Sequence, residues 1–116
     1  MSENNSRTFD LITLGQLLLR LSPPNNERLM RCDTFEKQVG GAELNVAVGV
    51  SLLGLHTGII SKLPSHDVGS FMKGKIRSYG VSDDFFIYDK SPSARVGIYY
   101  YENGAYPRKP KVIYDR

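Results

Sequence analysis

The chain is organised around one stretch, Val39-Gly40-Gly41-Ala42-Glu43-Leu44-Asn45-Val46-Ala47. Its two adjacent glycines allow backbone conformations closed to other residues and let a ligand approach the main chain. They lead directly into a helix-like pattern, and a helix start offers unpaired N–H groups and partial positive charge. Such a start suits an anionic or hydroxyl-rich small molecule. The alternative is a tight strand-to-helix turn that binds nothing.

The helix after the glycines is the clearest element of the sequence. Its apolar stripe follows helical spacing, and Gly54 supplies a C-terminal stop. The residues expected on the buried stripe are Leu44, Ala47, Val48, Ser51, Leu52 and Leu55.

Three extended segments are expected before this helix. Residues 9–14 (FDLITL) are apolar at almost every position, which is typical of a strand buried on both faces. Residues 17–21 form a second short strand, which ends at Pro23. Residues 28–39 alternate partly between polar and apolar side chains, which predicts an antiparallel strand with one wet face.

Strands and helices alternate after Gly54. We expect a strand at 56–63, a helix at 68–79 that ends at Gly80, and a strand at 85–88. The helix carries Phe71, Ile76 and Tyr79 on or near one face. This alternation predicts a parallel sheet with crossover helices.

The end of the chain changes character. Residues 94–101 and 112–114 are strand-like, and an Asn103-Gly104 pair of the kind found in hairpin turns lies between them. No helix pattern follows the last strand, so a sheet edge would be left open. The sequence therefore predicts that these residues are the N-terminal part of a longer fold, which they do not complete.

Composition bounds the remaining possibilities. The 116 residues suit one domain, with a flexible tail expected at 1–7 and the folded part at 8–116. A net charge of +3 without a dense basic block argues against a nucleic-acid partner. No apolar run reaches the roughly 18 residues of a membrane span, so a cytoplasmic protein is expected. A catalytic role for Cys32 would need a base, and neither His56 nor His66 lies in a recognisable cysteine-hydrolase context.

Several stretches, taken in order, resemble one family. They are ITLG (12–15) followed by LLRLSP (18–23), GGAELNVA (40–47), KLP (62–64), DVG (67–69), GV (80–81), RVGIYY (95–100) and KVIYDR (111–116). With these motifs the chain resembles the N-terminal part of PfkB-type, ribokinase-like carbohydrate kinases, and within them 2-keto-3-deoxygluconate kinases. Gln16 departs from the glutamate that many members carry, and Pro64 replaces a glycine. The family's Gly-Ala-Gly-Asp motif, with its catalytic base and anion hole, is not in these residues.

The resemblance implies a fold and a reaction. The fold would be α/β, a three-layer α/β/α arrangement with a mostly parallel sheet and a small β lid near 16–38 and 94–116. The full-length protein would transfer the γ-phosphoryl group of ATP, with Mg²⁺, to O6 of 2-keto-3-deoxygluconate. This segment alone would be inactive, with no catalytic, cofactor or metal residues, and would dimerise through its lid strands.

The resemblance also implies a substrate site at Gly40, Gly41, Asn45, Tyr99, Tyr114 and Arg116. Asn45 can donate to and accept from sugar hydroxyls, Tyr99 offers a ring and a hydroxyl, and Tyr114 and Arg116 would address the carboxylate.

Each assignment has an alternative from the residues themselves. Asn45 could only cap the helix or brace the turn, Glu43 could only complement the helix dipole, and Arg116 could be frayed. Tyr99, Tyr100 and Tyr101 cannot all face one side of a strand. The whole chain could belong to a fructose or ribose kinase of the same type, or form a non-catalytic sugar-binding or dimerisation module.

Overall fold

A computed structural model describes residues 8–116, and the tail expected at 1–7 lies outside them. Two four-stranded sheets form the framework. The first sheet contains β1 (Leu11–Leu14), β4 (Thr57–Pro64), β5 (Val81–Ser82) and β6 (Phe86–Asp89). The second contains β3 (Glu36–Gly40), β2 (Leu18–Ser22), β7 (Gly97–Glu102) and β8 (Lys111–Asp115), in that spatial order. The helices are α2 (Ala42–Leu52), α3 (Asp67–Ser78) and the short 3-10 helix η1 (Pro24–Asn26).

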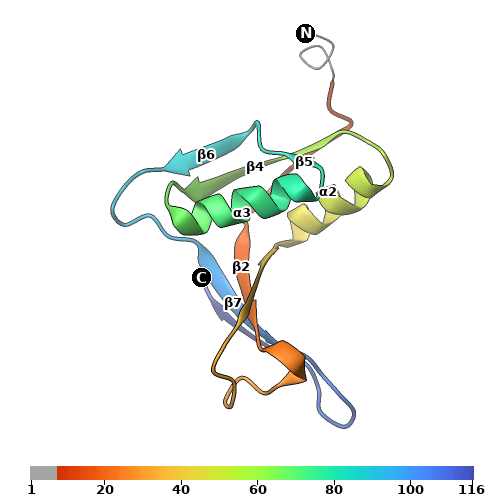
Figure 1. The fold of residues 1–116 in the computed structure, drawn as a ribbon. Helices are drawn as coiled ribbons and strands as arrows, with labels where there is room; N and C mark the ends of the chain where they lie inside the picture. Colours follow the sequence, from red (N-terminus) through yellow and green to blue (C-terminus); the bar gives the residue numbers. More distant parts are fainter. Residues whose placement is uncertain (1–7) are drawn as a thin grey trace.

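The first sheet is parallel throughout, as the alternation of strands and helices predicts. Strand β4 pairs with β1 along one edge and with β5 and then β6 along the other. Both helices cover the same face of this sheet (Figure 1). The two-residue strand β5 was not expected from the sequence, because it is too short to show a periodic pattern.

The core lies between this sheet and its two helices. Ile59 and Leu63 of β4 are fully buried with Ala47 of α2 and with Met72 and Ile76 of α3. The Thr57 hydroxyl also faces this side, since it donates to the carbonyl of Ala47 at 3.2 Å. Every second residue of β4 therefore faces the helices.

The opposite face of the first sheet corrects one expectation. Strand β1 was expected to be buried on both faces, yet Ile12 is 43% exposed and Leu14 is 72% exposed. Both side chains lie on the face that carries no helix. The described residues thus supply one of the two helical layers that a three-layer arrangement requires.

Helix α2 is shorter and less buried than its pattern predicts. Gly54 has a φ of +90°, as expected of a helix stop, but the helix already ends at Leu52. Leu52 is 79% exposed and Leu55 is 46% exposed, so neither belongs to the buried stripe. Leu44 and Ala47 are buried and Val48 packs against the core as a partly buried residue. The predicted stripe is incomplete because the apolar residues of α2 surround the helix instead of gathering on one side.

Helix α3 begins and ends near the expected residues. The His66 ring accepts a hydrogen bond from the Val68 N–H at 3.3 Å and so caps the helix. Its buried residues are Gly69, Met72 and Ile76, whereas Phe71 and Tyr79 of the expected face are only half-buried.

We call the second sheet, β3-β2-β7-β8, the lid. It projects away from the layer of the first sheet and its helices (Figure 1). Strand β3 is antiparallel to β2, as expected, but it begins only at Glu36. Residues 28–35 contain no strand; they include a turn at 29–31, where the carbonyl of Arg28 accepts from the N–H groups of Arg31 and Cys32 at 3.0 Å each. The strand expected at 28–39 is therefore wrong over residues 28–35.

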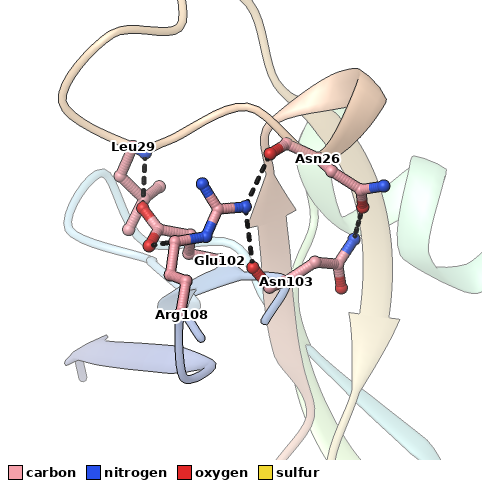
Figure 2. Close-up of polar contacts among 5 residues, drawn as sticks. All are labelled: Asn26, Leu29, Glu102, Asn103 and Arg108. Carbon is pink, nitrogen blue, oxygen red and sulfur yellow. Dashed lines mark hydrogen bonds and ion pairs between the residues drawn. The ribbon is translucent and has the colours of Figure 1, made fainter. Parts of the chain in front are cut away.

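The far end of the lid is held together by Arg108, which lies in the connection between β7 and β8. Its guanidinium donates to the carbonyls of Asn26 at 2.7 Å and Asn103 at 3.1 Å (Figure 2). The buried carboxylate of Glu102 lies beside it, with Nε and Oε2 3.9 Å apart, and accepts from the Leu29 N–H at 2.8 Å. One arginine thus joins the hairpin to the segment that follows β2.

Candidate functional site

The lid and the start of α2 line an open cavity of about 520 Å³. Of the six residues expected in the substrate site, five line it: Gly41, Asn45, Tyr99, Tyr114 and Arg116. Five further residues line it that the sequence did not single out: Leu18, Arg20, Ala42, Tyr101 and Val112. Residues far apart in the sequence therefore meet at one place.

The register of the lid explains why these side chains share a face. Tyr99 of β7 lies between Arg20 of β2 and Tyr114 of β8 as their direct partner. Alternation along β7 then places Tyr101 on the same face and Tyr100 on the other. The ring of Tyr100 packs instead against Phe35, with 5.7 Å between ring centroids. Consecutive tyrosines do face opposite sides, as the sequence requires.

The floor of the cavity is the glycine-led start of α2. Gly41 has a φ of +138°, and a Cβ placed there would lie 2.7 Å from the carbonyl oxygen of Gln16. Any other residue at this position would have a strained backbone, and its Cβ would clash with the Gln16 carbonyl. Within residues 8–116 no side chain caps α2, so the expected alternative in which Asn45 serves as the cap does not occur.

Gly40 is the one expected site residue that does not line the cavity. A Cβ built on Gly40 would lie 2.9 Å from Cε1 of Tyr99. Because Gly40 has no side chain, the Tyr99 ring can occupy the space beside it. Its contribution to the cavity is made through the position of Tyr99.

The charges that line the cavity are both positive. The Arg116 guanidinium carbon lies 4.6 Å from the ring centroid of Tyr114, and that of Arg20 lies 4.5 Å from the ring centroid of Tyr101. Such stacking holds a guanidinium in place and leaves its N–H edge available. The neighbouring carboxylate, Asp115, is paired outside the cavity with Arg95 at 3.7 Å. The cavity thus favours an anionic ligand.

A second cavity, of about 500 Å³, lies where β1, β4 and β6 end. Its lining includes both departures from the family pattern, Gln16 and Pro64, together with Asp89. The Ser91 backbone N–H donates to Asp89 at 3.0 Å, and this bond, the Ser91 side chain and Lys62 lower the pKa of the Asp89 carboxyl. Ligands of open α/β sheets commonly bind at the carboxyl ends of the strands, where this cavity lies.

Comparison with known proteins decides the family. The model of the pfkB family of carbohydrate kinases matches residues 8–111. This chain belongs to that family. The structure of a 2-dehydro-3-deoxygluconokinase from Thermotoga maritima is similar to it, with a TM-score of 0.86 and 38% identity over 94% of this chain and 32% of that one. The fold class expected from the sequence is therefore confirmed.

Two further relatives bear on the chemistry. A 2-dehydro-3-deoxygalactonokinase of Haloferax volcanii is 41% identical over 94% of this pfkB-family chain and 33% of its own length. A sugar kinase of Pyrococcus horikoshii, solved in complex with ATP, is 28% identical, with a TM-score of 0.77 over 90% of this chain and 33% of that one. The chain spans about a third of the length of each of these relatives.

None of the helices in residues 8–116 is long and apolar enough to cross a membrane. The described residues also contain no group of three His, Cys, Asp or Glu side chains that could hold a metal ion.

Proposed function

We propose that the complete gene product containing this chain is an ATP-dependent sugar-acid kinase that phosphorylates 2-keto-3-deoxygluconate at O6. One observation carries the proposal: the cavity combines Asn45, Tyr99 and Tyr114 with an arginine, and its lining includes no acidic residue. The 2-keto-3-deoxy sugar kinases among the relatives support the same substrate class.

In this proposal each residue of the cavity binds a different part of the ligand. Arg116, stacked on Tyr114, presents its planar N–H edge to the carboxylate in two parallel hydrogen bonds. Asn45 binds sugar hydroxyls through an amide that both donates and accepts. Tyr99 places its ring along the apolar face of the sugar, and Gly41 lets the ligand approach the backbone of α2.

Residues 8–116 would supply the substrate side of the reaction. We assign ATP, Mg²⁺ and the catalytic base to parts of the gene product other than these residues; the ATP complex of a relative supports the choice of nucleotide. Catalysis of phosphoryl transfer depends largely on positioning the acceptor hydroxyl, and we propose that the lid and α2 position it. Residues 1–116 alone would accordingly be inactive.

The test is a coupled ATP assay on the complete gene product with a panel of sugars. We expect turnover of 2-keto-3-deoxygluconate or its galactonate epimer to exceed that of fructose and ribose by at least about a hundredfold in kcat/KM. Strong turnover of a neutral sugar without turnover of the acid would identify the kinase as one for fructose or ribose. Absence of any turnover, with retained binding, would favour a non-catalytic sugar-binding module.

We further propose that a second copy of the protein binds the lid face opposite the cavity. That face carries the contacting rings of Phe35 and Tyr100, whose planes are inclined by 52°, and next to Tyr100 in register lies Ile113, which is 49% exposed. Light scattering of the complete gene product should give a dimer, and Ile113→Asp should shift it to a monomer. We also expect a cytoplasmic protein with a small-molecule partner.

A further inference from the structure

Arg20 is the second cation of the sugar-acid cavity, and the sequence did not single it out. It lies on β2, where it is the direct partner of Tyr99 across the parallel pairing with β7. Its guanidinium is held over the ring of Tyr101, 4.5 Å from the centroid. Arg20 therefore faces the cavity from β2, and Tyr114 faces it from β8, on the other side of β7.

The charge of Arg20 has no acidic partner among residues 8–116. Among residues 8–116 it has no carboxylate within 4 Å, whereas Arg95 and Arg108 are each paired with an acidic side chain. Its Nε is buried and makes no hydrogen bond to any described residue. The residue as a whole is only half-buried and lines the cavity, so an anionic group bound there would supply the missing counter-charge.

The positions of the two arginines define what they could bind together. Arg20, Tyr99 and Tyr114 lie in one row across three neighbouring strands, and neighbouring strands are about 4.8 Å apart. Arg116 lies two residues beyond Tyr114, so Arg20 and Arg116 are separated by two strand spacings and by two residues along the strands, which places their Cα atoms roughly 12 Å apart on either side of Tyr99. A six-carbon sugar acid lying on the Tyr99 ring would be flanked by both guanidinium groups.

We propose that Arg20 is a specificity-determining residue that recognises acceptor groups at the end of the ligand opposite to the one bound by Arg116. The cavity then prefers ligands with negative or strongly accepting groups at both ends over those with one. This inference rests on the proposed sugar-acid function and adds a second recognition element to it.

The experiment compares a six-carbon aldaric acid, which has a carboxylate at both ends, with the aldonic acid of the same sugar. Isothermal titration of the complete gene product, wild type and Arg20→Met, measures both affinities at low ionic strength. In the wild type we expect the aldaric acid to bind about tenfold more tightly, and in Arg20→Met we expect this preference to fall below about twofold. Arg20→Lys should retain part of it, since the charge remains without the planar fork.

Arg28→Met is the matched control, because Arg28 is exposed and does not line the cavity. It should leave both affinities unchanged. Equal binding of the two acids by the wild type, or an unchanged preference in Arg20→Met, would overturn the role of Arg20. Turnover of the keto-acid by the wild type is measured in a separate kinase assay. No turnover by the wild type would reject the proposed function, whereas turnover lost only in Arg20→Met would not.

Discussion

Tyr99 and Tyr114 lie directly opposite each other on β7 and β8, with their ring centroids 5.7 Å apart and their planes inclined by 35°. The pair forms an aromatic wall that continues into Arg116, whose guanidinium carbon lies over the Tyr114 ring, 4.6 Å from its centroid. An aromatic wall beside a guanidinium provides apolar contact and charge recognition next to each other, as a sugar acid requires.

Substitutions of Tyr99 separate the contribution of the ring from that of the hydroxyl. Tyr99→Phe should raise the KM for the keto-acid about three- to tenfold, because one hydrogen bond of about 0.5–1.5 kcal/mol is lost. Tyr99→Ala should raise it further, because the stacking surface is also removed. Steady-state kinetics on the complete gene product measures both, with Tyr106→Phe as the control at a fully exposed tyrosine. Equal KM values for all variants would show that Tyr99 does not contact the substrate.

Substitution of Gly41 tests the floor of the cavity. Gly41→Ala should destabilise the protein by about 1–3 kcal/mol, since the residue has a φ of +138° and its Cβ would meet the Gln16 carbonyl. Gly49→Ala is the matched control, because Gly49 lies in α2 and a Cβ added there would have no other atom within 4 Å. That substitution should be neutral or stabilise by about 0.5–1 kcal/mol. Thermal melts of the two variants report the difference; a Gly41→Ala protein as stable as wild type would contradict the strained start of α2.

Loss of Arg108 should loosen the far end of the lid. Arg108→Met removes two hydrogen bonds to backbone carbonyls and leaves the Glu102 carboxylate, which is 4% exposed, without its cation (Figure 2). We expect a local cost of about 1–3 kcal/mol. Hydrogen exchange should therefore become faster in residues 24–34 and 103–110.

The control for Arg108 is its exposed neighbour, Lys109→Met, which should leave hydrogen exchange unchanged. Adding Glu102→Gln to Arg108→Met should restore part of the protection, because the buried charge is then removed as well. Unchanged exchange in the Arg108→Met lid would argue that the contacts of Arg108 do not hold the hairpin in solution.

The sequence predicted the parallel sheet and the helix starts because glycines and apolar runs mark them locally. Gly41, Gly54 and Gly80 all have positive φ values at element boundaries, as their positions in the pattern require. The exposure of Ile12 and Leu14 could not be read from the same pattern, since it depends on which face the helices cover.

The candidate site was predicted residue by residue through the family resemblance, and the structure brings five of the six residues to one cavity. Arg20 escaped notice because its relation to Tyr99 arises from pairing between strands separated by many residues. The prediction of a strand at residues 28–35 was wrong for a similar reason. The hydrogen bond from the Leu29 N–H to Glu102, which helps fix the turn, joins residues 73 positions apart and so leaves no local pattern in the sequence.

The central claim is that this cavity recognises a sugar acid through Arg116. The most direct test is isothermal titration of 2-keto-3-deoxygluconate into the complete gene product, comparing wild type with Arg116→Lys and Arg116→Met. We predict that Arg116→Met weakens binding about 10- to 100-fold and that Arg116→Lys recovers only part of the loss, since lysine cannot form the bidentate pair. Binding of the acid with unchanged affinity by both variants would contradict the claim.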